Sequence, residues 1–275
     1  PFVDKKYSYW TKTTKKGNYS IKLRKSLKTG KKEEIWNGNK ENERTKSSYF
    51  GIGDLTVSHN DKLLAYSLDL KGSEYYNIYL RKINNSKNLP DILEDTTGSI
   101  LFTYDDKYVF YSKLDKNHRA KTIFLHKIGT TQKLDKLIYQ EKIDRFSVSI
   151  YPTSDEKFFI ISSGDHSTNK SYYLNSNLKS FKLNLFKDFK ENITYSLDSW
   201  NGYFYNHTND NAVDFKIERA SHTSINKVKV FVHPKKDTII GSYLILNDWF
   251  IWSETKNANQ KIFIISFSSN IIREI

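Results

Sequence analysis

One short run of residues holds a nucleophile, an acid and a base together. Ser163–Ser167 reads Ser-Gly-Asp-His-Ser. A catalytic triad needs its three groups to converge from separate elements, because each group must hold the next in a fixed geometry. Neighbours in one loop rarely achieve this. We therefore expect a polar hairpin loop between Ile161 and Tyr172 rather than an active site.

Other catalytic and binding motifs are absent, because the spacing of their residues is not found in this sequence. The nucleophile-elbow pattern G-x-S-x-G needs two glycines four residues apart, and no pair of glycines has that spacing. Gly51 and Gly53 begin like a dinucleotide fingerprint, but Thr56 stands at the third glycine position. Neither Asp105–Asp106 nor Asn209–Asn211 has the ligand spacing of a calcium loop, and there is no cysteine. The sequence therefore predicts no catalytic residue, cofactor or metal site.

The charge balance first suggests an anionic partner. The chain has 44 Lys and Arg against 31 Asp and Glu, a net charge of +13. Such an excess is typical of proteins that bind nucleic acid or acidic membranes. The surplus is mostly Lys, which is encoded by AT-rich codons like the abundant Asn, Ile, Tyr and Phe, whereas readout of base edges favours Arg. We therefore favour a solvated Lys-rich surface over a nucleic-acid site, and leave open whether the charge is functional or compositional.

Length and composition indicate a folded protein without a membrane span. A chain of 275 residues can bury a sizeable core, and 15% aromatic residues is far above the content of disordered chains. No stretch approaches the roughly 18 apolar residues of a membrane helix, and no apolar run follows the first residues as in a signal peptide. We expect a cytoplasmic protein with no membrane partner. Because Met is absent throughout, we expect the chain to be a segment of a longer protein.

The elements that must position any site are predicted to be short strands in a repeating pattern. Runs rich in Tyr, Phe, Ile and Val alternate with polar turns. Similar strand starts recur at steps of 45 to 50 residues, at Lys62, Lys107, Lys157, Gly202 and Asp248. A repeating all-β unit of this length is typical of a propeller blade, a four-stranded antiparallel sheet that stacks against its neighbours around a central channel. The sequence therefore predicts an all-β propeller with little helix.

One repeat shows the assignment. We expect Ile52–Ser58 as the inner strand, Lys62–Asp69 as the second and Tyr75–Lys82 as the third. Pro90–Leu93 would be a short outer strand, where proline is tolerated because one edge is unpaired.

This register divides the chain into about six blades. Their predicted ranges are 1–48, 49–95, 96–143, 144–192, 193–240 and 241–275. The last range has room for about two or three strands. A ring that stops within a blade leaves a strand edge and a sheet face uncovered, so we expect a partner surface outside this chain.

Several segments resemble the oligopeptidase B branch of the prolyl oligopeptidase family of serine peptidases, in the order of that family. They are Leu63–Asp69 with Gly72–Glu74, Leu125–Thr130, Asp135–Lys142, Phe146–Ile150, Ile160–Leu174 and Thr208–Lys216. The segment Leu125–Thr130 is similar to both branches, whereas Asp135–Lys142 is more similar to oligopeptidase B. The family usually has Arg after the Glu that corresponds to Glu254, where this chain has Thr255.

The resemblance implies a specific role. Members of that family join a seven-bladed propeller to a C-terminal α/β-hydrolase domain. The propeller excludes folded proteins, and the hydrolase domain carries a Ser-Asp-His triad and cleaves after Lys or Arg. This chain matches the propeller alone. The expected partners are therefore a hydrolase domain and short basic peptides, with no catalytic residue in residues 1–275.

Two alternative functions remain. A free-standing propeller could bind a protein or nucleic acid, and a propeller could carry an activity such as glycoside hydrolysis. The second lacks a recognisable pair of carboxylates of the kind that chemistry needs. The sequence that follows residue 275 would separate the peptidase from the binder.

One loop is the candidate contact with the missing domain. In a blade, the loop between the second and third strands opens at the same end as the connectors between blades. By resemblance, this end faces the hydrolase domain, and the loop of the third blade, Leu114–Ala120, lies at the boundary. Arg119 offers a donor fork suited to a carboxylate across an interface, and Asp115 lies in the same loop. We therefore predict Asp115 and Arg119 as interdomain gating contacts, with an exposed loop as the alternative.

Overall fold

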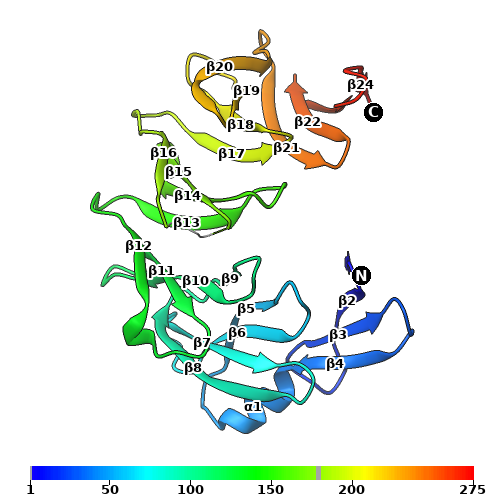
Figure 1. Cartoon of the computed structure of the whole chain (residues 1–275), viewed down its shortest axis with the longest axis vertical. Helices are drawn as coiled ribbons and strands as arrows, with labels where there is room; N and C mark the ends of the chain where they lie inside the picture. Colours follow the sequence, from blue (N-terminus) through cyan, green and yellow to red (C-terminus); the bar gives the residue numbers. More distant parts are fainter. Residues whose placement is uncertain (1, 178–180) are drawn as a thin grey trace. The chain divides into compact units, whose positions relative to one another are not determined.

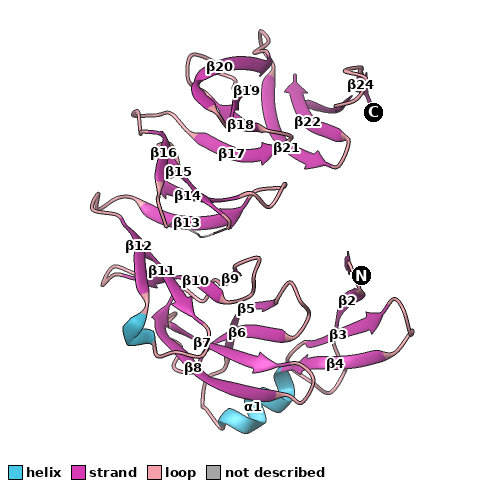
Figure 2. Ribbon diagram, in the orientation of Figure 1, coloured by secondary structure: helices cyan, strands magenta, loops and turns pink. Residues whose placement is uncertain are grey.

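A computed structural model describes residues 2–177 and 181–275, and almost every element is a β-strand (Figures 1 and 2). The chain folds as two compact units. Unit 1 consists of Pro1–His118 and Phe124–Leu137, and unit 2 of Arg119–Ile123 and Ile138–Ile275. This confirms an all-β fold built of antiparallel blades.

Unit 1 begins with two sets of four strands. The elements are β1 (Phe2–Asp4), β2 (Tyr7–Lys12), β3 (Ile21–Ser26), β4 (Lys32–Asn37), α1 (Gly38–Thr45), β5 (Gly51–Val57), β6 (Leu63–Asp69), β7 (Tyr76–Lys82) and β8 (Lys87–Thr96). The third set is β9 (Leu101–Phe102), β10 (Tyr108–Leu114), β11 (Ala120–Lys127), the 3₁₀ turn η1 (Gln132–Leu134) and β12 (Lys136–Gln140). The division between the units runs through β11 and β12.

Unit 2 contains three further sheets of four strands. They are formed by β13 (Ser147–Pro152), β14 (Phe158–Gly164), β15 (Asn169–Asn175) and β16 (Asn184–Lys187); by β17 (Tyr195–Trp200), β18 (Tyr203–Thr208), β19 (Lys216–Ser221) and β20 (Ser224–Val232); and by β21 (Ile239–Leu246), β22 (Trp249–Lys256), β23 (Asn259–Ser266) and β24 (Ile272–Glu274).

One pair, Thr96 with Lys113, also joins β8 to β10, so that β5–β12 form one eight-stranded sheet. Within each set of four strands, which we call a sheet, neighbouring strands pair antiparallel in chain order. The loop between the second and third strands and the connector that leaves the fourth strand therefore lie at one end of the sheet, which we call the connector end. The turns after the first and third strands lie at the other end, which we call the turn end.

A repeated turn explains the period seen in the sequence. In three successive sheets, the first and second strands are joined by a turn in which a main-chain N–H donates to the carbonyl oxygen three residues earlier, at 2.9 Å each time. The accepting residues are Ser58, Thr103 and Thr153. The donors adopt the left-handed conformation, with φ of 63°, 54° and 59° at Asp61, Asp106 and Glu156. Two of the three donors are Asp, which tolerates this conformation, so similar turn residues recur at the blade spacing in the first two of these turns.

Aromatic side chains fill the space between neighbouring sheets. In unit 1, buried Trp36 and Tyr66 belong to one core cluster between the first two sheets. In unit 2, Phe158 packs on Phe204 with ring centroids 4.8 Å apart. Face-to-face sheets lie roughly 10 Å apart, and large rings bridge that distance.

The prediction of an incomplete last sheet was wrong. The structure has four strands there, and β21 begins at Ile239 rather than residue 241. The fourth strand is three residues long and pairs with Phe263–Ile265. A strand that short has no periodicity that sequence reasoning could detect.

The outer strand of the second sheet is longer than predicted. It spans Lys87–Thr96 rather than Pro90–Leu93. Its register against β7 shifts between Tyr79 and Arg81. Pro90, which has no N–H to donate, lies opposite this irregularity.

The helix α1 was not predicted, because its sequence is polar throughout and carries no apolar stripe. Asn37 caps its first turn, with the side-chain oxygen accepting the N–H groups of Asn39 and Lys40. Buried Glu41 then binds Arg81 of β7, with 2.6 Å between Oε1 and Nη1. The helix is therefore held to the second sheet by a charge pair rather than by an apolar face.

Candidate functional site

The loop predicted between the second and third strands of the third blade is present. It joins β10 and β11 at the connector end of the third sheet and consists of residues 115–119. The division between the units falls between His118 and Arg119, so Asp115 belongs to unit 1 and Arg119 to unit 2.

In unit 1, Asp115 shapes the first half of this loop. Its carbonyl oxygen accepts the hydroxyl of Tyr75 at 3.0 Å, and its Oδ1 accepts the N–H of Asn117 at 2.8 Å. The ring of Tyr75 also meets His118 edge-on, with centroids 4.7 Å apart. Tyr75 comes from the equivalent loop of the second sheet. Two connector-end loops of unit 1 are thus joined through one tyrosine.

In unit 2, Arg119 and Lys121 hold the connector that leads to the fourth sheet. The guanidinium of exposed Arg119 donates to the carbonyl oxygen of Asp144. The Lys121 ammonium donates to the carbonyl oxygens of Ile143, Asp144 and Phe146 at 2.7, 2.8 and 2.6 Å. A cation that donates to three main-chain oxygens fixes the local backbone.

A buried carboxylate anchors the same connector. Glu141 accepts hydrogen bonds from the hydroxyls of Ser163 and Tyr139 and from the N–H of Ile143, and lies 3.1 Å from the ammonium of Lys170. Burial raises the pKa of this carboxyl, but the hydrogen bonds outweigh burial and lower the pKa to about 2. Glu141 is therefore ionised and structural.

The run Ser163–Ser167 forms the expected hairpin loop. The strand β14 ends at Gly164 and β15 begins at Asn169. Between them, Asp165 accepts the N–H groups of Ser167 and Thr168, both at 2.9 Å. The acid of this run closes the turn, so the residues do not converge as a triad.

The fold assembles another set of serine, histidine and aspartate in unit 2. The Ser199 hydroxyl donates to Asp155 Oδ2 at 2.9 Å and lies 2.8 Å from His222 Nε2. In a catalytic triad the histidine lies between the acid and the serine. Here the serine lies in the middle and is fully buried, so no substrate can reach it. This set stabilises the packing of β17.

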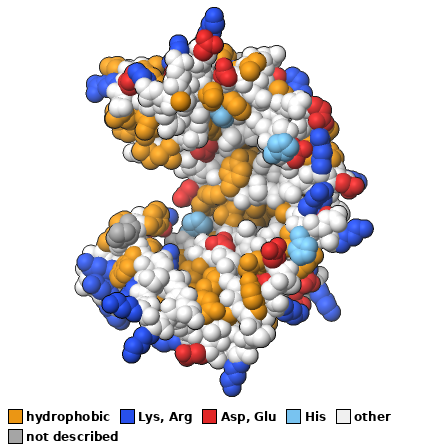
Figure 3. All heavy atoms as spheres, turned by 180° about the vertical axis from the view of Figure 1, so that it is seen from behind, with side chains coloured by type: hydrophobic (Ala, Val, Ile, Leu, Met, Phe, Trp, Pro, Cys, Tyr) orange, Lys and Arg blue, Asp and Glu red, His pale blue; other side chains and the backbone are white. Residues whose placement is uncertain are grey.

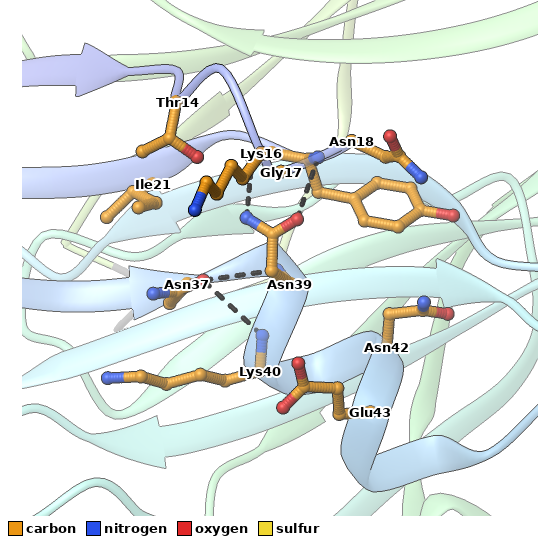
Figure 4. Close-up of a pocket in the computed structure, with 11 residues that line it drawn as sticks. Thr14, Lys16, Gly17, Asn18, Ile21, Asn37, Asn39, Lys40, Asn42 and Glu43 are labelled. Carbon is orange, nitrogen blue, oxygen red and sulfur yellow. Dashed lines mark hydrogen bonds between the residues drawn. The ribbon is translucent and has the colours of Figure 1, made fainter.

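A pocket of about 410 Å³ opens at the connector end of the first sheet (Figure 4). The side chain of Asn39, at the start of α1, pairs with both main-chain groups of Tyr19, at 3.1 and 2.9 Å. Gly17 lies so close that an added Cβ would stand 2.7 Å from Asn39. The pocket is polar, with Lys16 and Glu43 among its lining residues.

Sequence reasoning missed most residues that build the connector end. Tyr75 lies 40 residues from Asp115, and Lys121 lies 22 residues from Ile143. These partners meet only through the order of the strands. One signal existed for Glu141, because it falls within the segment Asp135–Lys142 that carries the family resemblance.

Neither a metal centre nor a membrane helix emerges from residues 2–177 and 181–275. This part of the chain contains no group of three or more histidine and acidic side chains arranged to hold a metal, and none of its helices is long and apolar enough to cross a membrane.

The whole chain, residues 1–275, matches the family model of the prolyl oligopeptidase N-terminal β-propeller domain. Protease 2 of Moraxella lacunata is 21% identical over 273 residues, which are 96% of this chain and 39% of that protein. Dipeptidyl aminopeptidase BI of Pseudoxanthomonas mexicana is 25% identical over 221 residues, which are 79% of this chain and 30% of that protein.

Solved structures share the fold at similar identities. Oligopeptidase B from Leishmania major superposes with a TM-score of 0.92 at 21% identity, covering 100% of this chain and 40% of that one. The covalent antipain complex of oligopeptidase B from Trypanosoma brucei gives 0.90 at 21% identity, with the same coverage. The chain therefore spans two fifths or less of these relatives.

Proposed function

Because this chain belongs to the family of prolyl oligopeptidase N-terminal β-propeller domains, we propose that it is the substrate-gating part of a serine oligopeptidase that cleaves short peptides after Lys or Arg. The observation that carries the proposal is the family match over residues 1–275. In the proposal, the triad belongs to a C-terminal α/β-hydrolase domain outside this chain.

The connector ends provide the surface for that domain. In unit 2, Lys121 and Glu141 fix the backbone of the connector before the fourth sheet, and in unit 1, Tyr75 joins two loops. Fixed loops meet a partner without losing much conformational entropy. Such a surface suits a domain interface that must guide peptides.

An exposed apolar face on the last sheet is evidence for a further blade. Leu244, Leu246, Trp249 and Ile262 share that face by their register, and they are 55, 44, 37 and 46% exposed. The opposite face carries buried Phe250. Blades need neighbours on both faces, so we propose that another blade covers these residues in the intact protein.

The preference for Lys or Arg is carried by the resemblance in Asp135–Lys142. In the structure, residues of this segment stabilise the propeller: Asp135 binds His126, and Glu141 anchors a connector. The side chains that read a basic residue at the cleavage site are therefore assigned to the hydrolase domain.

Activity assays on the chain and on the intact protein test the proposal. The 275-residue chain alone should not hydrolyse fluorogenic peptides that end in Arg, Lys or Pro. The intact protein should cleave the Arg and Lys peptides faster than the Pro peptide. Turnover by the chain alone that Ser167→Ala abolishes would contradict the first half. An intact protein without peptidase activity would favour a free-standing binding propeller.

A further inference from the structure

A second pocket lies in unit 1, at the turn ends of the first two sheets. It has a volume of about 580 Å³, within the range of small-molecule sites. The lining residues are Lys6, Tyr7, Arg24, Asn60, Asp61, Lys62, Leu63, Lys82 and Asn84. It lies at the opposite end of these sheets from the loops discussed above, so it is separate from the proposed interdomain surface.

The floor of this pocket is a fixed guanidinium. Arg24 is 6% exposed. Its Nε donates to Glu33 at 2.6 Å and its Nη1 to the carbonyl oxygen of Asp61 at 2.7 Å. Its Cζ lies 4.1 Å from the centroid of the Tyr7 ring. Hydrogen bonds and stacking hold this side chain in one position, as recognition of an anion requires.

The carboxylate in the lining is already engaged. Asp61 is 9% exposed and its Oδ1 accepts the hydroxyl of Tyr9 at 2.6 Å. The lining therefore combines three lysines and Arg24, whose charge is paired with Glu33, with one carboxylate that is turned into the protein.

Three lysines around the rim have no anionic partner. Lys6, Lys62 and Lys82 are exposed, and within residues 2–177 and 181–275 none of them forms an ion pair. Figure 3 shows further Lys and Arg side chains at the surface. Other exposed lysines in the described part of the chain, such as Lys12 and Lys71, form no ion pair either, so what distinguishes these three is that they line one pocket. Like charges that share one pocket repel each other, and an anion would remove that repulsion.

We propose that this pocket binds a small molecule that carries several phosphate groups. Lysine ammoniums and the guanidinium are donors without acceptor capacity, so they suit a ligand rich in acceptor oxygens and negative charge. Lysine binds phosphate as a point charge. The Asn60 and Asn84 amides supply further polar groups.

A nucleic acid is a poorer match. Nucleic acids need basic residues spread along a backbone track, whereas these cations surround one compact pocket.

Binding of inorganic tripolyphosphate, measured by calorimetry on the 275-residue chain, tests the proposal. Tripolyphosphate should bind with one-to-one stoichiometry and more tightly than sulfate at matched ionic strength. The triple variant Lys6→Gln/Lys62→Gln/Lys82→Gln should lose at least tenfold in affinity. The control Lys12→Gln/Lys71→Gln/Lys133→Gln removes the same charge from exposed lysines outside the pocket and should change affinity less than threefold. Circular dichroism checks that both variants are folded.

Adenosine triphosphate, a single-stranded oligonucleotide and an acidic peptide serve as competitors. Displacement of tripolyphosphate by the nucleotide would identify a nucleotide source for the phosphates. Equal affinity for sulfate, equal losses in both triple variants, or tighter binding of the oligonucleotide or the peptide would overturn the proposal.

Discussion

At the scale of single residues, His126 shows how the fold stabilises a buried charge. Its ring is fully buried. Nδ1 lies 2.6 Å from Asp135 and Nε2 lies 2.9 Å from Asp91. Because both nitrogens face carboxylates, both must donate, and the ring is an imidazolium. Burial lowers the pKa of His126, but the hydrogen bonds to Asp135 and Asp91 outweigh burial and raise the pKa above its ordinary value.

His126→Gln should therefore reduce stability in a pH-dependent way. A raised folded-state pKa gives stabilisation that is complete below the ordinary pKa of histidine and is lost as pH rises through the folded-state pKa. We expect a loss of about 3 kcal/mol near pH 6. The groups that face the ring are Asp91 and Asp135, and the Tyr111 hydroxyl binds Asp135 at 2.8 Å. Urea unfolding from about pH 6 to about pH 9 checks this. A difference in unfolding free energy between the two proteins that stays constant over this range would contradict it.

Glu141 makes the opposite pH prediction. Its folded-state pKa of about 2 lies below the ordinary value of 4.5, so its stabilisation is present above the ordinary pKa and is lost as pH falls through the folded-state pKa. Glu141→Gln should cost about 2 to 4 kcal/mol near pH 7. The difference between variant and parent in urea unfolding should shrink as the pH is lowered toward about 2. A constant difference would show that Glu141 stabilises the connector without its charge.

At the scale of elements, the central strands were predictable and the irregular elements were not. Strand pairs around Lys62, Lys107 and Lys157 follow from alternating patterns and turn residues that recur. The helix α1 is stabilised by the distant pair of Glu41 and Arg81, which no local pattern reveals.

Substitution of Phe204 tests how the sheet that contains β18 packs on the sheet that contains β14 and β15. Phe204 is fully buried, and its ring centroid lies 4.8 Å from that of Phe158 and 5.0 Å from that of Tyr173 on the neighbouring sheet. Phe204→Ala should reduce the free energy of unfolding by about 3 to 5 kcal/mol, because it leaves a cavity. The adjacent Tyr203 is 39% exposed, and Tyr203→Ala should cost about 1 kcal/mol or less. Similar losses for both variants in urea titrations would rule out the packing account.

At the scale of the whole molecule, the position of the candidate loop was predictable and its chemistry was not. The order of strands places residues 115–119 at the connector end. The bond from Arg119 to the carbonyl of Asp144 depends on the path of a connector 25 residues away, which spacing cannot reveal. For the same reason, the fixed Arg24 beneath three lysines was invisible in a chain read as generally basic.

The proposed interdomain role of Asp115 and Arg119 is tested in the intact protein. Arg119→Ala should change peptide turnover by more than the roughly 0.5 kcal/mol expected of a neutral surface change. Lys116→Ala, an exposed charge in the same loop, is the matched control. Wild-type turnover, peptide affinity and thermal stability in Arg119→Ala would refute the interface role of this residue.

The central proposal is that this propeller belongs to a peptidase that accepts short peptides and excludes folded proteins. The most direct test is the kcat/KM of the intact protein for one basic cleavage sequence, presented first in a short peptide and then within an exposed loop of a folded protein. We expect efficient cleavage of the peptide and no cleavage of the folded substrate. Comparable kcat/KM values for the two substrates, or no cleavage of the peptide, would contradict it.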